Sequence, residues 1–336
     1  MHKLKRFLKW AFGILLGLAF GIWVAFQVSP WPSAMVIRQL FNQPIEIGNP
    51  SRFETAQASV SLEQDIEYTS DYLNNTLDIY FPANLDSARP VLIWLHGGGY
   101  VAGDKTGLQE FAHYVVDALD LAVISINYET APSSQYPGQL NQLDEAIQFL
   151  TANQDTYRML DLSQLVIGGD SAGAQIAGQY VAVQTNDAYA ESLQMPQSLE
   201  IAQLKGFISF CGPLNLIETA SETTTDGFMK FFVKTVAWSL IGERDWKNSP
   251  VLDEASLVAQ LTEDFPPTYL TDGNAYSFEA QGVSFANRLN QLDVPVSSLF
   301  YTDSDKEIVH EYQFDFTTLE AEDNLENTLD FLSTYL

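Results

Sequence analysis

Short apolar runs alternate with segments of helical periodicity over most of the chain. From about residue 61, runs that are apolar on both faces predict strands, and apolar residues recurring every three or four positions predict helices. The predicted strands are 77–82, 91–97, 122–128, 165–169, 206–212, 267–273 and 297–303. The predicted helices are 107–119, 138–152, 172–185, 278–291 and 319–335. This alternation is typical of an α/β fold, a mostly parallel sheet with helices on both faces.

One segment breaks the alternation. Residues 216–262 separate the strands 206–212 and 267–273 and are longer than one crossover helix requires. Within them, residues 227–242 are amphipathic and rich in aromatic side chains. Two interpretations stay open, a crossover helix packed on the sheet and a cap over a binding site, and we expect the cap.

The N-terminal residues have the pattern of a membrane anchor. Residues 10–28 contain no charged side chain, and nineteen helical residues span about 30 Å, the thickness of a bilayer core. Trp10 and Trp31 flank this run, as interfacial aromatic residues do. Residues 1–9 carry four basic side chains and no acidic one, which predicts a cytoplasmic tip. We expect a single-pass signal anchor in the cell membrane with an extracytoplasmic body; a cleaved signal peptide and a buried soluble helix are the alternatives.

Four prolines, at positions 30, 32, 44 and 50, follow this segment. They predict that residues 29–60 form a spacer with some irregular structure. Residues 61–336 then form one α/β domain.

Charge and composition narrow the function classes. The chain has 43 acidic and 16 basic residues and a net charge of -27; because the tip contributes +4, the remainder carries -31. This balance excludes a nucleic-acid-binding protein, which needs a basic surface. A hydrophobic fraction of 46% supports a sizeable core. The single cysteine, Cys211, excludes an intrachain disulfide and a multi-cysteine metal site, and we expect neither a metal nor an organic cofactor.

The segment Gly169-Asp170-Ser171-Ala172-Gly173 fits the pattern G-x-S-x-G. It lies between a predicted strand and a predicted helix, which is the context of a nucleophile elbow. The helix N-terminus beside the serine favours developing negative charge. We therefore predict Ser171 as a catalytic nucleophile; a structural glycine-rich turn is the alternative.

A second glycine-rich segment, His96-Gly97-Gly98-Gly99, follows the strand 91–97. Acyl transfer develops an oxyanion that preorganised N–H groups must stabilise. We assign these donors to the amides of Gly98, Gly99 and Ala172. A phosphate-binding loop is the alternative, although no GxGxxG or Walker pattern accompanies the glycines. We expect His96 to bond to the loop backbone and not to act as the base.

Only one histidine, His310, follows Ser171 in the chain. In serine hydrolases of this strand–turn–helix type the triad runs in the order nucleophile, acid, base, which predicts His310 as the general base. A solvent-exposed loop histidine is the alternative. His113 precedes the serine on a predicted helix, and we expect it to be structural.

Several of these segments together resemble a known family. HGGGY (96–100), GDSAGA (169–174), NYETAPSSQYPGQL (127–140) and HEYQF (310–314) resemble the hormone-sensitive-lipase-like carboxylesterases of the α/β-hydrolase superfamily. The resemblance covers residues 61–336, and the related group includes esterases acting on acetylated or feruloylated polysaccharides. It implies an α/β-hydrolase fold, a small cap near the active site, and hydrolysis of small acyl esters, acylated sugars among them, by a serine esterase.

The sequence departs from that family in two places. The family's Tyr-Arg-Leu-Ala-Pro is Tyr-Glu-Thr-Ala-Pro at residues 128–132, so Glu129 replaces a basic residue. The family also places the triad aspartate ten residues after the first of two adjacent prolines. In this chain the prolines are Pro266 and Pro267, and the corresponding position is Tyr276. A tyrosine cannot stabilise an imidazolium by charge.

Nearby carboxylates are therefore candidates for the triad acid, and the alternative is that no acid serves. We favour Asp272, at the end of the strand 267–273, because a strand end holds a side chain rigidly. Glu279, at the start of the next helix, is the second choice, and Asp303 and Asp305 on the loop before His310 are further candidates.

These observations predict a membrane-anchored serine carboxylesterase acting on a small-molecule ester. The acidic surface should repel polyanionic substrates. A catalytically inactive hydrolase fold that serves as a surface binding module is a rival hypothesis, motivated by Tyr276. A peptidase or amidase with the same triad is another.

Overall fold

The computed structural model describes residues 2–42 and 46–336, in which eight strands form one sheet in the order β1-β2-β4-β3-β5-β6-β7-β8. The strands are β1 (Val60–Glu67), β2 (Thr76–Pro82), β3 (Arg89–Leu95), β4 (Ala122–Ile126), β5 (Leu160–Asp170), β6 (Leu204–Phe210), β7 (Thr268–Asp272) and β8 (Val296–Phe300). The pairs β1–β2 and β2–β4 are antiparallel and all others are parallel. The predicted α/β fold with a mostly parallel sheet is confirmed.

All seven predicted strands are present, and β1 is the one that the sequence pattern missed. Its residues are exposed or half-buried along the whole strand, so it lacks the apolar run that marks the buried strands. A register shift between Glu63 and Ile66 further interrupts its alternation. An edge strand of this kind is identified by its pairing and not by its hydrophobicity.

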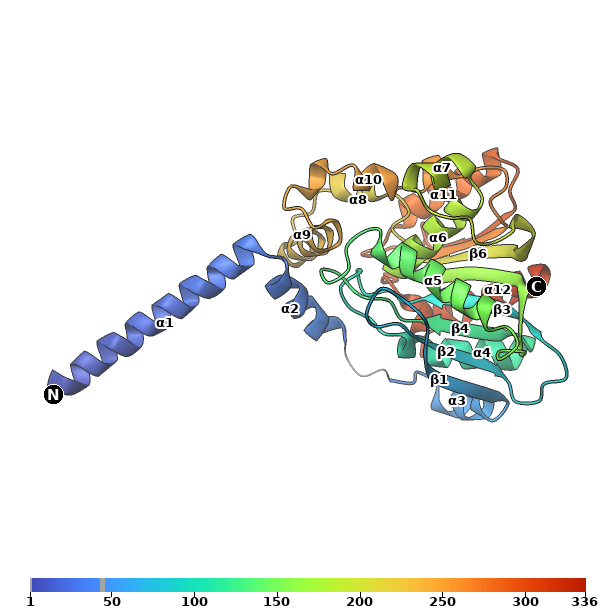
Figure 1. Ribbon diagram of the computed structural model, residues 1–336, viewed down its shortest axis with the longest axis horizontal. Coiled ribbons are helices and arrows are strands. Elements are labelled where there is room, and N and C mark those ends of the chain that lie inside the picture. Colours follow the sequence, from blue (N-terminus) through green and yellow to red (C-terminus); the bar gives the residue numbers. More distant parts are fainter. Residues whose placement is uncertain (1, 43–45) are drawn as a thin grey trace.

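Helices cover both faces of the sheet (Figure 1). The five predicted helices correspond to α4 (Gln109–Leu119), α5 (Gly138–Ala152), α6 (Ala172–Gln184), α11 (Glu279–Gln291) and α12 (Leu319–Tyr335). Ile93 and Leu95 of β3 pack with α5, α6 and α11, whereas Leu92 and Trp94 pack with α4 and α12. Successive β3 residues are thus buried on opposite faces, which explains the continuous apolar runs.

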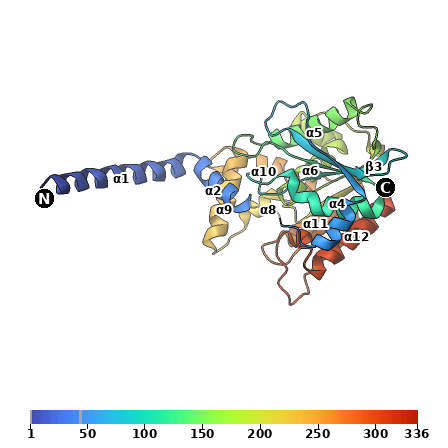
Figure 2. The ribbon, with the colours of Figure 1, turned by 90° about the horizontal axis from the view of Figure 1, so that it is seen from below.

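The segment 216–262 forms α8 (Leu216–Ser221), α9 (Gly227–Ile241) and α10 (Val251–Glu254), joined by short turns. These helices lie together at the end of the body from which α1 projects (Figures 1 and 2). On α9, Phe232 and Val236 lie directly against Gly99 of the HGGG segment. This contact with the HGGG segment is the one that the cap interpretation expects, and residues 216–262 are called the cap below.

The N-terminal helix α1 (His2–Val28) projects away from the body as a single rod (Figure 1). Within residues 2–42 and 46–336, Lys3–Val28 is the one helix long and apolar enough to cross a membrane, and none of its most apolar stretch is buried in the body.

Residues 29–60, the predicted spacer with some irregular structure, include helices that the sequence pattern did not predict. They contain two helices, α2 (Trp31–Phe41) and α3 (Pro50–Gln57). Proline stands in the first turn of each, where its missing N–H costs nothing, so these prolines begin helices and do not break them. Pro44, which also contributed to the expectation, lies outside the described residues.

Arg38 fastens α2 to the body. Its guanidinium donates to the carbonyl oxygens of Val101 at 2.6 Å and Ala131 at 2.8 Å, and to Oγ1 of Thr130 at 2.9 Å. A basic side chain thus reaches the segment in which Glu129 stands at the family's arginine position, but it comes from α2.

Candidate active site

Ser171 stands between the end of β5 at Asp170 and the start of α6 at Ala172. Its backbone has φ 48° and ψ -118°, a conformation that an L-residue rarely adopts. Position 173, two residues after the serine, requires glycine because a Cβ there would collide with the carbonyl of Leu95. The local structure is the sharp strand-to-helix turn expected for a nucleophile elbow.

His310 reaches Ser171 from a loop 139 residues further along the chain, with Nε2 at 3.0 Å from the serine Oγ. The loop is braced from a second segment, because the His310 N–H donates to the carbonyl of Ala275 at 3.0 Å. The ring of Phe278 lies edge-on to the imidazole at 5.6 Å. The predicted nucleophile and base are therefore within hydrogen-bonding distance, which proton transfer requires.

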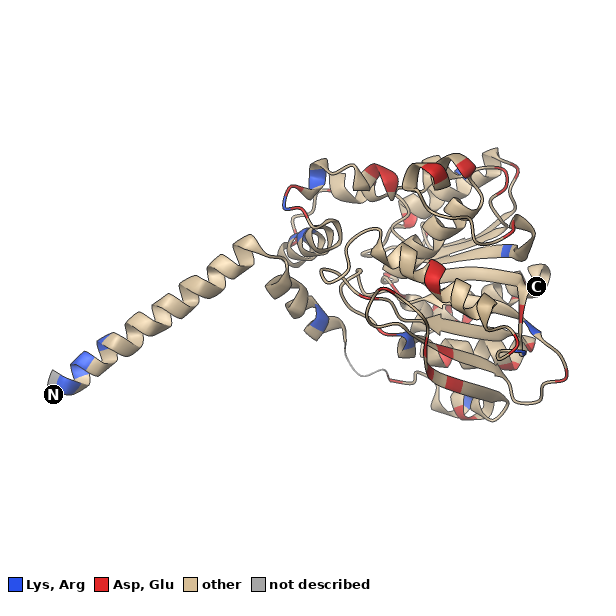
Figure 3. Ribbon diagram, in the orientation of Figure 1, with Lys and Arg blue, Asp and Glu red and all other residues tan. Residues whose placement is uncertain are grey.

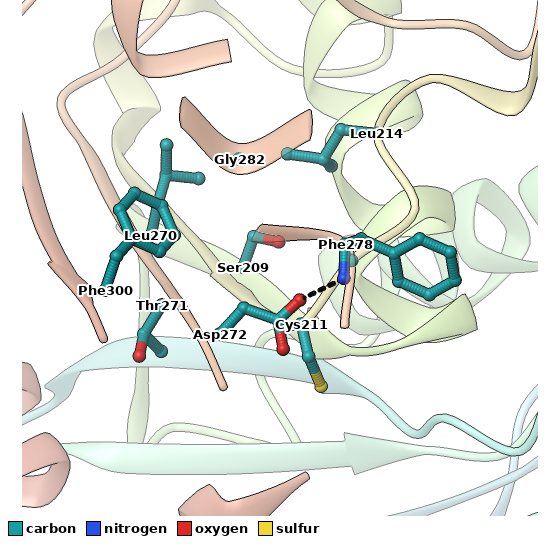
Figure 4. Close-up of a pocket in the computed structure, with 10 residues that line it drawn as sticks. Ser209, Cys211, Leu214, Leu270, Thr271, Asp272, Phe278, Gly282 and Phe300 are labelled. Atoms are coloured by element: carbon teal, nitrogen blue, oxygen red, sulfur yellow. Dashed lines mark hydrogen bonds between the residues drawn. The ribbon is translucent and has the colours of Figure 1, made fainter. Parts of the chain in front are cut away.

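Asp272, the last residue of β7, is the carboxylate that faces the other imidazole nitrogen. Its Oδ1 lies 3.9 Å from Nδ1 of His310. The carboxylate accepts N–H bonds from Gly273 at 2.7 Å and from Phe278 at 2.6 Å, and Figure 4 shows the second of these. Three elements, β7, the turn after it and the His310 loop, thus hold the acid and the base in place.

Burial dominates the electrostatics of this pair. Desolvation raises the pKa of Asp272 to about 7 and lowers the pKa of His310 to about 4. Nδ1 of His310 is buried and has no hydrogen-bond partner among the described residues. Because Asp272 Oδ1 is the acceptor directly opposite, a small rotation that shortens the 3.9 Å distance would satisfy both groups.

For the remaining candidate acids, and for Tyr276, no ion pair with His310 is found among the described residues. Tyr276, at the family's aspartate position, is 65% exposed and in the left-handed region with φ 54°. Glu279 accepts the hydroxyl hydrogen of Thr302 at 2.9 Å. Asp303 and Asp305 are exposed on the loop before His310.

The HGGG segment lines the cleft above Ser171. Gly98 has φ 101° and Gly99 has φ 59°, so both need the freedom of glycine. Both residues line the same cleft as Ser171 and Ala172. His96 stays in the loop: its Nδ1 bonds to the carbonyl of Gly97 at 2.8 Å, as we predicted.

His113 is structural, also as predicted. Its Nδ1 bonds to the carbonyl of Gln109 one turn earlier, and its ring lies between those of Phe53 and Tyr80.

Two further carboxyl groups, Asp170 and Glu311, meet beside this site, and the sequence did not predict their meeting. Asp170 accepts the indole N–H of Trp94 at 2.8 Å and the Gly97 N–H at 2.6 Å. A Cβ on Gly97 would collide with Asp170 Oδ2 and would lie 2.8 Å from Glu311 Oε1. The two carboxyls therefore flank the same glycine. Their neighbours in sequence, Ser171 and His310, are the only local signal of this pair.

Desolvation raises the pKa of Asp170 to about 6 and the pKa of Glu311 to about 8, the second also because of the Asp170 charge. Burial and the mutual repulsion of the two carboxyl groups therefore both disfavour a second negative charge in this pair.

One group of potential metal ligands exists among the described residues. Donor atoms of Cys211, His310 and Glu311 lie within 4.8 Å of one another. Burial raises the pKa of the Cys211 thiol well above its usual range, which disfavours the thiolate that a metal binds. His310 is bonded to Ser171 through Nε2. The donor set therefore fits a serine site better than a metal site.

The cleft above Ser171 and His310 has a volume of about 1200 Å³. Its walls come from the cap, chiefly α9, and from Phe41 of α2. This volume is large enough for a drug-sized ligand.

Known proteins share this architecture. A family model described as BD-FAE matches residues 77–285, which include the HGGG segment and Ser171. A putative alpha/beta hydrolase of Acanthamoeba polyphaga mimivirus is 22% identical over 76% of this chain and 74% of its own length. The isoprenylcysteine alpha-carbonyl methylesterase ICME of Arabidopsis thaliana is 24% identical over 73% of this chain, but the match spans only 56% of that protein. The structure of esterase B from Lactobacillus rhamnosis superposes with a TM-score of 0.68 at 20% identity, covering 91% of this chain and 96% of that one.

Proposed function

We propose that this chain, which belongs to the BD-FAE family and has the α/β-hydrolase fold, is a membrane-anchored serine carboxylesterase. The observation that carries the proposal is the 3.0 Å hydrogen bond between His310 Nε2 and Ser171 Oγ on a nucleophile elbow. Relatives described as esterases support the same reaction class.

In the proposed reaction, Ser171 Oγ attacks the ester carbonyl carbon while His310 Nε2 takes the hydroxyl proton. Asp272 then faces an imidazolium and stabilises its charge. The carbonyl oxygen becomes an oxyanion that the amides of Gly98, Gly99 and Ala172 stabilise. When the tetrahedral intermediate collapses, His310 gives its proton to the leaving alcohol, and an acyl-enzyme remains on Ser171.

Water completes the cycle. His310 removes a proton from a water molecule, which attacks the acyl carbonyl carbon. A second tetrahedral intermediate collapses, the proton returns to Ser171 Oγ, and the carboxylic acid leaves. No cofactor takes part in this scheme.

The substrate is an ester of a neutral alcohol. The net charge of -27 repels polyanionic substrates, and apolar side chains of α9 form much of the cleft wall. Small acyl groups on sugars fit these limits.

We assign the N-terminal helix the role of a single-pass anchor. Its apolar stretch is unburied, and its basic first residues keep the N-terminus cytoplasmic, which places the catalytic domain outside the cytoplasm.

The full-length protein in detergent should hydrolyse p-nitrophenyl acetate, and Ser171→Ala should abolish this activity. A fluorophosphonate probe should label the wild type and not the variant. Equal hydrolysis by both proteins would refute the assignment, and a folded wild type that the probe does not label would favour the inactive binding module. Parallel assays with peptide substrates test for a peptidase.

A further inference from the structure

The exposed side of α2 is apolar apart from Gln39. Ser33, Ala34 and Ile37 are buried against the body, and the half-buried Arg38 is bonded to it. The exposed large side chains of α2, called here the α2 face, are Trp31, Met35, Val36, Leu40 and Phe41. A surface helix of a water-soluble domain normally turns polar residues outward, so this face needs a partner that is itself apolar.

The chain connectivity places this face next to the end of α1. Only Ser29 and Pro30 separate α1 from α2, and two residues span less than about 10 Å. The cap contacts the end of α1, because Arg244 donates to the side-chain oxygen of Gln27 in the last turn of that helix at 3.5 Å. Both views show α2 and α9 side by side at this end of the body (Figures 1 and 2).

The cleft opens at the same place. Phe41 of α2 and Phe228 of α9 both line the cleft, and they are 44% and 46% exposed. Phe232 joins them, with ring centroids 5.6 Å and 6.3 Å away. An aromatic cluster from α2 and α9, called here the cleft rim, therefore lines one side of the cleft that contains Ser171.

Basic side chains accompany this rim. Residues 227–247 contain four basic and two acidic side chains, in a chain with 16 basic and 43 acidic residues. The four basic ones, Lys230, Lys234, Arg244 and Lys247, are all exposed. Figure 3 shows basic residues on the cap and on α2, at the end from which α1 projects. Aromatic and basic side chains around an apolar face are typical of contact with lipid headgroups, above all anionic ones.

We infer that the α2 face and the cleft rim contact the surface of the bilayer that α1 spans, so that the cleft opens toward the membrane. The substrate class follows: amphiphilic esters whose apolar chain passes from the bilayer along Phe41 and Phe228 to Ser171, with a neutral head group. This inference rests on the proposed function for its chemistry and on the anchor for its geometry.

Site-specific labelling tests the contact without any turnover. Val36→Cys and Leu85→Cys form a matched pair, because these apolar residues are 41% and 38% exposed. Leu85 lies between β2 and β3, near the amino end of β3, whereas Ser171 follows the carboxyl end of the parallel strand β5. The native Cys211 is buried, so the wild type serves as the unlabelled control. The full chain is labelled with the environment-sensitive fluorophore NBD in nanodiscs of phosphatidylcholine and phosphatidylglycerol.

We expect nitroxide-bearing lipids to quench the probe at position 36 and aqueous iodide to quench the probe at position 85. Equal iodide quenching at both positions would overturn the inference. Protection of position 36 from iodide without quenching by lipid would overturn it as well, and would indicate that a second copy of the chain covers the α2 face.

A kinetic experiment tests the substrate class. The double variant Met35→Glu/Val36→Glu places two charges on the α2 face away from the cleft, and Leu85→Glu is its control. Hydrolysis of p-nitrophenyl palmitate dissolved in the nanodisc should fall about tenfold in the double variant, because charged residues are expelled from a lipid interface. Hydrolysis of water-soluble p-nitrophenyl acetate should stay unchanged in both.

The two failures are distinguishable. If the double variant loses both activities equally, or neither, the inference about the membrane is wrong while the esterase assignment stands. If the wild type hydrolyses neither ester, the proposed function is wrong, and the quenching data still decide whether the α2 face contacts lipid.

Discussion

The role of Asp272 can be tested by replacing it with asparagine. The substitution keeps the side-chain volume. In the native protein, the two carboxylate oxygens of Asp272 accept N–H bonds from Gly273 and Phe278. An asparagine can offer an oxygen to only one of these donors. When that donor is Phe278, the NH₂ group points toward Nδ1 of His310. Nδ1 must then accept a hydrogen bond, Nε2 carries the hydrogen, and the imidazole can no longer take the proton of Ser171.

The size of the effect follows from the geometry. In the transition state, Asp272 and the imidazolium are opposite unit charges, and their atoms lie 3.9 Å apart before any closure. At an effective dielectric constant of about 20, this attraction amounts to about 4 kcal/mol. A loss of about 4 kcal/mol in transition-state stabilisation lowers the rate about a thousandfold.

The assay is kcat/KM for p-nitrophenyl acetate at pH 8, with circular dichroism to show that Asp272→Asn is folded. Glu279→Gln is the control, because Glu279 bonds to Thr302 and should change kcat/KM by less than about twofold. If Asp272→Asn kept more than about a tenth of the wild-type activity, or if Glu279→Gln lost as much as Asp272→Asn, the reasoning would be refuted.

The pH profile offers an independent check on the same residue. Burial raises the pKa of Asp272 to about 7, so below this pH the acid is protonated and donates to Nδ1, which again leaves the hydrogen on Nε2. Wild-type kcat/KM should therefore rise with pH through a midpoint near 7. This limb should be absent from the low residual activity of Asp272→Asn. A wild-type profile that stays flat from pH 7 down to pH 5 would contradict the argument.

Three further predictions concern the surroundings of the site. The folded-state pKa of Glu311 is raised from 4.5 to about 8, so its contribution to stability is complete below about pH 4.5 and is lost as the pH rises through 8. Differential scanning calorimetry should therefore show that Glu311→Gln raises Tm by about 4 °C at pH 8.5 and does not raise it at pH 4.5. Gly99→Ala would place a Cβ 2.9 Å from Phe232 at a positive φ and should lower kcat about a hundredfold, whereas Gly107→Ala, with open space around it, should leave kcat unchanged. Arg38→Ala should lower the free energy of unfolding by about 2 kcal/mol in urea titrations, and Arg38→Lys should not restore it, because one ammonium group cannot reproduce the planar three-bond geometry.

Most of the fold was predictable because its signals are local. The inner parallel strands, β3 to β7, are mostly buried and appear as apolar runs. All five predicted helices exist with similar bounds. The elbow at Ser171 was predictable for the same reason, since the strand end, the glycines and the helix start are contiguous in sequence. The edge strand β1 and the helix α2 were missed because one lacks a buried run and the other begins at prolines that resemble a loop signal.

The sequence by itself thus determined the α/β fold, the order of the elements, the elbow at Ser171, and His310 as the histidine that follows it. Tertiary structure alone decided which carboxylate faces that histidine, because β7 and the loop after β8 must pack together before Asp272 comes within 3.9 Å of Nδ1. It also brought Glu311 beside Asp170 and seated the cap beside the end of α1. The physical reason is common to all three: charges and apolar faces interact through space over a few ångströms, and sequence spacing carries no record of contacts between segments that are distant in the chain.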